Sequence, residues 1–466
     1  MASTDVTSPA LSDVAAPSLE LTDGSRVAVL GGGPAGSFFS YFLLQIAQRV
    51  GLDLRLDIYE ARDFSALAPK GCNMCGGIIS ESLVQHLAAE GINLPGTVVQ
   101  RGIDSYFLHM DVGSVRIETP LQEMRIAAVH RGAGPRGAQL PLRFRGFDGY
   151  LLELAAAQGA HVVRKRVDGV SWENGRPCLA TPDGARESYD LLAVAVGVNT
   201  SALKLFESLG LAYKPPVSTK TYICEFFLGE ETIRRTLGSS MHVFLLNLPR
   251  LEFAAFIPKG DYVTFCLLGR DIDPALVRSF LASPEVKQCL PPGWEPPQDF
   301  CHCSPKLSIE GAQHAFADRL VFIGDCGVTR LYKDGIGAAY RTAKAAAVAA
   351  VFEGISAEHF RRHFWPACRK ISSDNRIGEI VFAVTRLIQR LRFLRRGVWR
   401  MVSEEQRRQG ARRRMSMVLW DTFTGSAPYR DVFLRTLSPA FWGRLGWDTL
   451  IGNLRPSPAR KNEGIS

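Results

Sequence analysis

Residues 26–47 read RVAVLGGGPAGSFFSYFLLQIA, an apolar run, a glycine-rich turn and a second, longer apolar stretch. The run Arg26–Leu30 is typical of a buried parallel strand. Gly31, Gly33 and Gly36 meet the pattern G-x-G-x-x-G, whose glycines provide a tight turn, close backbone approach to a pyrophosphate, and helix–strand packing. This segment therefore predicts a strand–turn–helix unit that can hold a phosphate group.

A second predicted strand strengthens this interpretation. Leu54–Tyr59 is apolar and leads into Glu60, whose carboxylate can accept hydrogen bonds from a ribose diol and would repel a 2′-phosphate. Together the two strands predict a βαβ unit that binds a dinucleotide. A βαβ unit without a ligand is the alternative.

Composition sets the outer bounds. The 466 residues are enough for two or three lobes with their own cores, and 46% hydrophobic with 22% charged residues is ordinary for a globular protein. Ten cysteines without regular spacing favour reduced thiols and a cytoplasmic location. Residues 1–25 lack the regions of a secretory signal, and we expect a disordered leader there. No window is apolar for long enough to span a membrane.

Two later segments identify the dinucleotide. Arg319–Asp325 (RLVFIGD) reads as a strand ending in Gly-Asp, and Lys333–Ala339 (KDGIGAA) opens a strongly helical run. With Arg145–Leu152 (RGFDGYLL), these segments resemble the FAD-dependent monooxygenases and geranylgeranyl reductases, within the p-hydroxybenzoate hydroxylase-type flavoprotein superfamily. The resemblance implies FAD as cofactor, with Asp325 near the ribityl chain and the helix start facing the flavin.

The resemblance also implies individual cofactor contacts. The arginine register leaves Arg143 and Arg145 as alternatives, and Ala195–Asn199 departs from the family's Gly-Ala-Asp-Gly turn. The expected cofactor-binding residues are Gly31, Gly33, Pro34, Ala35, Gly36, Glu60, Ala61, Arg62, Gly76, Gly77, Arg145, Gly324, Asp325, Gly335, Ile336 and Gly337.

The stretch Pro69–Ser80 (PKGCNMCGGIIS) holds two cysteines three apart. It resembles the Lys-x-Cys-Gly-Gly segment of geranylgeranyl reductases, which implies that Cys75 lies beside the flavin as a catalytic residue. Four interpretations stay open: a zinc site shared with Cys301–Cys303, a dithiol relay, a single Cys75 that shapes the pocket or shuttles a proton, and buried cysteines without chemistry. We expect no metal, and the role of Cys72 is undecided.

Two regions of short alternating strands predict a substrate domain inserted into the FAD domain. In the second region, Phe253–Asp261 (FAAFIPKGD) resembles the reductases' Tyr-x-Trp-x-Phe-Pro-Lys-Gly-Asp strand and turn, with Ala255 in place of the Trp. The expected substrate-binding residues are Phe253, Phe256 and Pro258, and plain sheet core is the alternative for the two phenylalanines. Without the Trp, the pocket should be larger or differently shaped.

The C-terminal region is basic. The net charge is +9, and arginines crowd residues 361–414. Val384–Val402 predicts one amphipathic helix with an apolar stripe from Leu387 to Met401 and flanking arginines. Such a helix can lie on an anionic membrane, dock a redox partner protein or pack on its own body. No fold signature supports nucleic-acid binding.

These observations predict an α/β fold, namely a Rossmann-type FAD-binding domain with an inserted mixed β-sheet substrate domain and a C-terminal helical region. The expected division is 1–25 leader, 26–97, 143–216 and 306–355 FAD-binding domain, 98–142 and 217–305 substrate domain, and 356–466 helical region.

The expected function is reduction of C=C bonds in an isoprenoid or other apolar, lipid-like substrate by hydride from reduced flavin, on the inner face of a membrane. A flavin monooxygenase, a quinone-linked electron-transfer flavoprotein and a non-catalytic FAD-bearing subunit are the alternatives. No second glycine-rich nucleotide unit follows, so the expected donor is either transient NADPH or NADH or a protein such as a ferredoxin.

Overall fold

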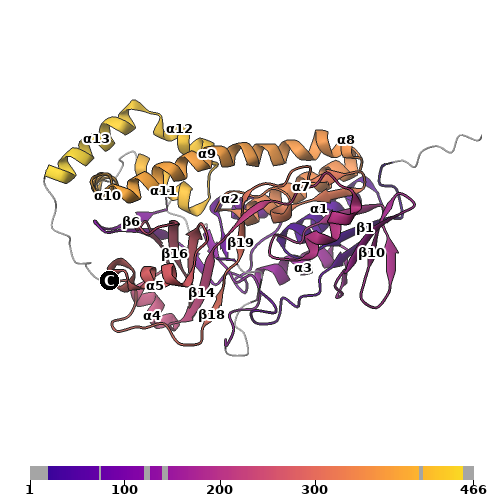
Figure 1. Ribbon diagram of the computed structural model, residues 1–466, viewed down its shortest axis with the longest axis horizontal. Helices are drawn as coiled ribbons and strands as arrows, with labels where there is room; N and C mark the ends of the chain where they lie inside the picture. Colours follow the sequence, from indigo (N-terminus) through magenta and orange to yellow (C-terminus); the bar gives the residue numbers. More distant parts are fainter. Residues whose placement is uncertain (1–18, 73–74, 120–125, 139–144, 409–412, 455–466) are drawn as a thin grey trace, which may run out of the picture.

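The computed structural model describes residues 19–72, 75–119, 126–138, 145–408 and 413–454 (Figure 1). A six-stranded sheet in the order β20-β21-β12-β1-β2-β8 is parallel from β21 to β8. Because β1 lies between β12 and β2, the glycine turn after β1 emerges in the middle of the sheet. The strands are β1 (Ser25–Leu30), β2 (Leu54–Tyr59), β8 (His161–Val163), β12 (Leu191–Val194), β20 (Phe316–Ala317) and β21 (Leu320–Phe322).

Both faces of this sheet are covered, which explains the continuous apolar run of β1. Val27 and Val29 pack in one core with the helices α1 (Pro34–Val50), α3 (Phe147–Ala157) and α7 (Gly335–Phe352). Ala28 and Leu30 face the opposite core, formed with a small antiparallel sheet. That sheet comprises β9 (Gly169–Glu173), β10 (Arg176–Ala180) and β11 (Arg186–Ser188), followed by the 3₁₀ helix η1 (Ala202–Leu209).

A mixed seven-stranded sheet forms the second lobe, in the order β18-β14-β17-β16-β15-β5-β6. Only β5 and β15 pair in parallel, and they join the two inserted regions of the sequence. One face is covered by α4 (Glu230–Thr236), α5 (Pro274–Ala282) and α6 (Pro284–Lys287). The strands are β5 (Ser105–Met110), β6 (Gly113–Glu118), β14 (Tyr222–Phe227), β15 (Ser240–Phe244), β16 (Leu251–Lys259), β17 (Tyr262–Gly269) and β18 (Cys301–Cys303).

Smaller sheets connect the two lobes. The strands β3 (Ile78–Ile79), β7 (Ile126–Ala128) and β4 (Arg101–Ile103) form an antiparallel trio, and β13 (Val217–Lys220) pairs with β19 (Lys306–Glu310). The helix α2 (Glu81–Ala89) and the short 3₁₀ helix η2 (Gly324–Cys326) complete this part of the chain.

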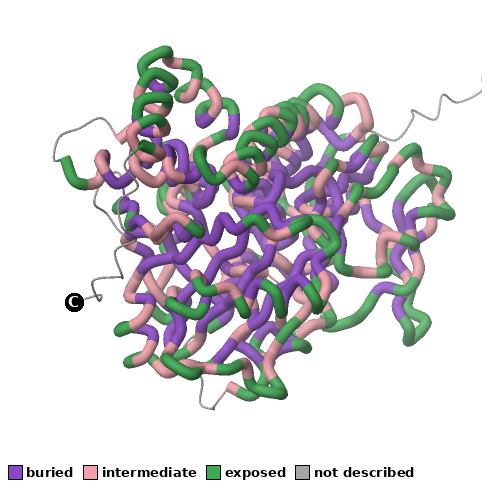
Figure 2. The backbone as a smooth tube through the Cα atoms, turned by 60° about the vertical axis from the view of Figure 1, so that its left-hand side comes forward, coloured by how far each residue is buried: buried purple, intermediate pink, exposed green. Residues whose placement is uncertain are grey.

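The C-terminal helices cover the other face of the seven-stranded sheet. Figure 1 shows α9 running from α8, near α7, towards α10 above β6 and β16. Figure 2 shows buried residues concentrated in the interior and exposed residues along the outer turns of the helices. The elements are α8 (Ala357–His359), the π-helical turn η3 (Phe360–Phe364), α9 (Trp365–Arg390), α10 (Arg392–Arg407), α11 (Arg414–Thr424), α12 (Tyr429–Thr436) and α13 (Pro439–Leu454).

Two sequence predictions need correction here. The predicted leader extends too far, because Leu21 is buried and Ser25 already begins β1; residues 1–18 lie outside the described residues. The predicted single helix Val384–Val402 is broken at Leu391, whose extended backbone separates α9 from α10. Its apolar stripe is divided as a result: Leu387 is exposed, whereas Met401 is buried.

None of the helices in the described residues is long and apolar enough to cross a lipid bilayer.

Candidate flavin and substrate site

The glycine turn is set by two close contacts. Gly31 has φ +106°, and a Cβ there would lie 2.7 Å from the Ala195 carbonyl oxygen. A Cβ at Gly36 would lie 1.9 Å from the Gly31 carbonyl oxygen, so only glycine lets α1 pack this closely. Gly33 caps α1 and lines a cavity of about 520 Å³ with Pro34. The helix N-terminus thus opens onto the cavity, as a pyrophosphate site requires.

Glu60 lies at the carboxyl end of β2, beside the turn. Its Oε2 accepts from the Gly32 amide at 3.0 Å and its Oε1 from the Arg62 amide at 2.9 Å. Both bonds hold the carboxylate at the cavity wall, and its remaining lone pairs can accept from a ribose diol.

The middle of the cavity lies between η2 and the start of α7. Asp325 and Gly335 both line it, and a Cβ at Gly335 would lie 3.8 Å from Asp325 Oδ1. Desolvation raises the pKa of the Asp325 carboxyl. A hydrogen bond with the Thr329 hydroxyl and the charge of the Arg131 guanidinium lower it by less. A partly desolvated carboxyl next to a glycine helix start suits a polyol chain and a flat ring, so these residues fit FAD.

Most of the predicted cofactor residues meet at this one cavity, although they come from five separate segments. Those that line it are Gly31, Gly33, Pro34, Ala35, Glu60, Ala61, Arg62, Gly76, Gly77, Asp325, Gly335 and Ile336, together with Cys75. Gly36, Gly324 and Gly337 lie behind the wall. A Cβ at Gly324 would lie 2.6 Å from the Ala35 Cβ, and one at Gly337 would lie 2.3 Å from Asp334 Oδ1.

Arg145 is placed differently from the prediction. Its guanidinium is half exposed and pairs with Glu153, away from the cavity. The alternative, Arg143, lies outside the described residues. Arg131 lines the cavity instead, and its Nη2 donates to Asp148 Oδ2 at 2.9 Å. In the sequence, no periodic pattern marks Arg131 as a cavity residue. The acidic residue Asp148, 17 positions later, was the one hint of a partner for it.

Arg131 also contacts the thiol of Cys75. Burial lowers the pKa of Arg131, but the Asp148 carboxylate and Cys75 together raise it by more than burial lowers it. The guanidinium therefore stays charged. Cys75 therefore lines the cavity beside a fixed positive charge.

The two glycines after Cys75 allow close packing. Gly77 has φ +70°, and a Cβ there would lie 1.9 Å from the Val129 carbonyl oxygen. A Cβ at Gly76 would lie 2.8 Å from Cys266 Sγ. The chain thus runs directly along the inner wall of the cavity.

The structure bears on two of the four interpretations of Cys72 and Cys75, the dithiol relay and the zinc site. All ten cysteines are free thiols, so Cys72 and Cys75 form no disulfide here. Among the described residues, the His, Cys and acidic side chains that meet at metal-ligand distance do not include Cys72, Cys75 or Cys301–Cys303. The structure therefore gives no support to zinc binding by this pair.

The substrate side of the cavity is apolar and comes from the seven-stranded sheet. Ala255 and Ile257 of β16 line it, with Cys266 and Leu268 of β17. Ala255, which stands where the reductases have Trp, thus lies on the cavity wall. This is the place where the resemblance predicted a larger or differently shaped pocket. Further apolar lining is contributed by Ile223 and Leu307.

The predicted substrate residues do not line the cavity, and strand parity explains two of the three. Successive side chains of β16 alternate between faces. Phe256 therefore points away from the cavity and stacks on Phe265 with ring centroids 3.6 Å apart. Pro258 shares that parity and is not among the lining residues. Phe253 has the right parity, but it is buried under Phe382.

Lys333 is a site residue that the sequence analysis missed. It lines the cavity just before α7, and its Nζ lies 4.4 Å from the centre of the Phe253 ring. Desolvation lowers the pKa of Lys333 to about 8. Its ammonium can therefore release a proton near neutral pH. Its place directly before the predicted glycine helix start was the available signal.

Comparisons with known proteins address the fold. No protein-family model matches the chain, and no curated protein matches it by sequence. Solved structures do match. The halogenase PltM in complex with phloroglucinol and FAD is 12% identical, with 93% of each chain covered and a TM-score of 0.56.

Two other similar structures agree. PqsL, a probable FAD-dependent monooxygenase from Pseudomonas aeruginosa, is 14% identical and covers 76% of this chain and 95% of its own, with a TM-score of 0.51. The 2-methyl-3-hydroxypyridine-5-carboxylic acid oxygenase is 16% identical and covers 79% of this chain and 93% of its own, with a TM-score of 0.53. The chain therefore has the fold of these flavin-dependent enzymes, which confirms the predicted fold class.

Proposed function

We propose that this protein is an FAD-dependent oxidoreductase and that it carries out monooxygenation of an apolar organic substrate. One observation carries the proposal: a single cavity runs from the glycine turn and Glu60, past Asp325, to the apolar wall at Ala255 and Ile257. A dinucleotide end and an apolar end that share one cavity allow cofactor and substrate to meet. The similar structures include a halogenase and two oxygenases, which favours oxygenation over reduction.

The side chains divide the work by position. The N-terminus of α1 at Gly33 would hold the pyrophosphate, Glu60 the ribose, and Asp325 the ribityl hydroxyls. The amides at Gly335 and Ile336 would stabilise negative charge on the ring through the N-terminus of α7. When bound, FAD supplies two-electron chemistry between an electron donor, dioxygen and the substrate.

The chain's own residues then manage protons and water. The Lys333 ammonium faces the cavity and can donate a proton to a leaving oxygen or to the substrate. Arg131 holds Cys75 at the wall. The apolar side chains of β16 and β17 exclude water from the substrate end.

Reduction of a C=C bond in an isoprenoid is the second candidate, and one observation favours it. A Cβ at Gly77 would lie 2.9 Å from Lys259 Nζ, so the two segments that resemble reductases pack against each other. Lys259 in turn ion-pairs with Glu225 at 3.5 Å. In this reaction Cys75 would protonate the second carbon.

An anaerobic visible spectrum of the purified protein tests both candidates. We expect an oxidised flavin band that bleaches on addition of NADPH or NADH. Oxygen uptake that rises with an added aromatic or other apolar substrate would support monooxygenation, and anaerobic saturation of a prenyl lipid would support the second candidate. A flavin that stays oxidised until dithionite is added would favour a protein donor or a quinol. A chain that takes up no FAD would overturn the proposal.

We further propose that the protein attaches peripherally to an anionic lipid surface, where an apolar substrate would be available. On α13, Trp442, Trp447, Leu450 and Leu454 are each more than half exposed, and the exposed positions of this helix carry no charge. The helices α10 and α13 pack together. A face of this kind is rare on a monomeric soluble protein.

Arginines adjoin this face. Arg390 ends α9, Arg392 begins α10, and both are exposed, next to the half-exposed Phe393. Phe393 lies beside the end of α13, since its carbonyl accepts from Asn453 Nδ2 at 3.1 Å. Exposed tryptophans on a helix whose end lies near exposed arginines match the interface of an anionic bilayer in both polarity and charge.

Vesicle sedimentation tests this attachment. We expect the protein to sediment with vesicles that contain phosphatidylglycerol and not with phosphatidylcholine alone. The double variant Trp442→Ser/Trp447→Ser should stay in the supernatant, whereas Trp172→Ser, on β9 of the other lobe, should sediment like the original chain. A chain that forms a dimer through this face and ignores both vesicle types would refute lipid attachment.

A further inference from the structure

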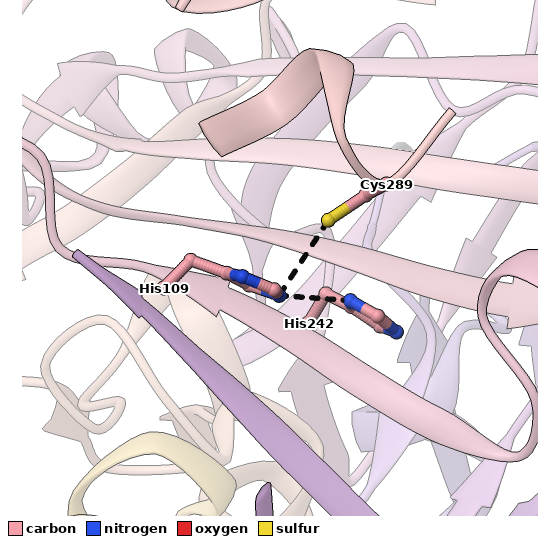
Figure 3. A group of neighbouring side chains, drawn as sticks. All are labelled: His109, His242 and Cys289. Atoms are coloured by element: carbon pink, nitrogen blue, oxygen red, sulfur yellow. Dashed lines mark hydrogen bonds between the residues drawn. The ribbon is translucent and has the colours of Figure 1, made fainter. Parts of the chain in front are cut away.

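A second cluster of reactive side chains lies inside the substrate lobe, away from the flavin cavity. His109 on β5, His242 on β15 and Cys289, just after α6, come together from three parts of the chain (Figure 3). All three are buried, with at most 4% of each side chain exposed. The flavin chemistry proposed above uses none of them.

Their ligand atoms already have spacings close to those of a metal centre. His109 Nε2 lies 2.9 Å from His242 Nδ1 and 3.6 Å from Cys289 Sγ. A tetrahedral zinc ion with bonds of about 2.0 Å to nitrogen and 2.3 Å to sulfur separates two nitrogens by about 3.3 Å and nitrogen from sulfur by about 3.5 Å. The sulfur distance already fits, and the two nitrogens need to part by only about 0.4 Å.

The outer nitrogen of each ring is held from behind. His242 Nε2 donates to the Leu237 carbonyl at 3.2 Å, which leaves its Nδ1 lone pair turned inward. His109 Nδ1 lies 2.7 Å from the Ser114 hydroxyl. Metal-binding histidines are usually oriented by such partners. Because the two inner nitrogens face each other, either a proton or a metal ion must lie between them.

The buried surroundings favour the neutral imidazoles that a metal ion needs and disfavour the thiolate, which the ion itself would have to stabilise. Desolvation lowers the pKa of both histidines, that of His242 to about 4, so both are neutral at pH 7. Desolvation also raises the pKa of the Cys289 thiol to about 12. No carboxylate belongs to the group, which disfavours the hard cations Ca²⁺ and Mg²⁺.

We propose that His109, His242 and Cys289 bind one zinc ion, which links β5, β15 and the segment after α6. Binding converts the Cys289 thiol to a thiolate and releases its proton to solvent, while both imidazoles bind in their neutral form. No fourth His, Cys, Asp or Glu ligand joins the group within the described residues, so a water molecule would complete the tetrahedron. The sequence by itself predicts no metal here, because His109 lies 133 residues from His242 and 180 residues from Cys289.

Zinc analysis of the full-length protein, with its cofactor, tests the proposal. The protein is dialysed against a chelator and then titrated with zinc in competition with a chromophoric chelator. We expect one zinc per chain for the original protein and for Cys368→Ser, which alters another buried cysteine, and none for Cys289→Ser. Circular dichroism checks that each variant is folded.

Two further measurements keep the test independent of folding. Ser114→Ala, which retains all three ligands, should weaken zinc binding by about 10- to 100-fold. Cobalt(II) added to the original protein should give a thiolate-to-metal charge-transfer band that Cys289→Ser lacks. Failure of the original protein to bind zinc, or equal binding by Cys289→Ser, would show that the inner nitrogens share only a proton.

Discussion

Gly36 sets how closely α1 approaches β1. A Cβ there would lie 1.9 Å from the Gly31 carbonyl oxygen, which is backbone and cannot turn aside. The helix would have to move outward, and with it the N-terminus that faces the cavity. The motif glycine thus acts through packing although it does not line the cavity itself.

We therefore expect Gly36→Ala to lower the free energy of unfolding by about 1–3 kcal/mol through overpacking, and to weaken FAD retention. Urea unfolding and the flavin content of the purified protein measure the two effects. Gly96→Ala is the matched control, because its Cβ would meet nothing within 4 Å. Equal stability of the two variants would argue against the close contact.

Lys333 makes stability depend on pH. Its pKa is about 8 in the folded chain and near 10.5 when unfolded, so between these values the unfolded chain binds more protons. The free energy of unfolding should therefore rise with pH from about 8 to about 10.5. At pH 7 the buried ammonium costs up to about 3 kcal/mol.

The variant Lys333→Met should accordingly be more stable than the original chain at pH 7, and the difference should shrink as the pH approaches 10.5. Urea unfolding of the flavin-free chain across this range measures it. A constant difference at all pH values would mean that Lys333 is fully ionised in the folded state. Loss of turnover in the same variant, with flavin still bound, would support its role as a proton donor.

At the scale of the element, β16 separates two environments by parity alone. Ala255 lines the cavity, whereas its neighbour Ala254 packs in the core under α4 and α5. The two residues are equally buried, at 1% exposure each, so burial by itself does not reveal the difference.

The pair Ala255→Leu and Ala254→Leu tests this assignment. Ala255→Leu should leave the melting temperature nearly unchanged, because its side chain enters open space, but it should slow substrate turnover. Ala254→Leu should cost about 1–3 kcal/mol of stability, with little effect on the cavity. Thermal unfolding and oxygen uptake distinguish the two. The reverse pattern would place β16 in the opposite register.

At the scale of the whole molecule, the C-terminal helices are joined to the substrate sheet by buried polar contacts as well as by apolar ones. Arg395 of α10 is buried, and its Nη2 donates to Asp111 Oδ2 at 3.0 Å in the turn between β5 and β6. In the sequence, this arginine flanks or lies opposite the apolar stripe of the predicted helix Val384–Val402, whose surroundings stay open there. The break at Leu391 turns it inward instead.

Asp111→Asn should destabilise the protein by about 1–3 kcal/mol, since it leaves the Arg395 guanidinium buried without its counter-charge. Arg392→Gln is the control. Arg392 reaches the same carboxylate at 3.7 Å but is mostly exposed, so its loss should cost at most about 0.5 kcal/mol. Urea unfolding compares them, and equal effects would mean that the inward turn of α10 contributes nothing.

The sequence by itself determined the nucleotide end of this protein. Each of its features is local: an apolar run that ends in glycines, a carboxylate after the next strand, and a Gly-Asp pair before a helix. A local backbone requirement, such as the positive φ of Gly31, selects the residue type at that position and is therefore visible in the sequence. The α/β fold class and the wall of the cavity from Gly31 to Ile336 could therefore be predicted.

Only the tertiary structure decided the rest. Whether Ala255 or Phe256 faces the cavity depends on which side of β16 the C-terminal helices cover, and whether Arg131 or Arg145 reaches it depends on where Asp148 is buried. His109 and Cys289 meet only because a helix crosses the sheet 180 residues later. These are long-range packing choices, and a local pattern carries no signal for them because both outcomes satisfy the same backbone and the same hydrophobicity.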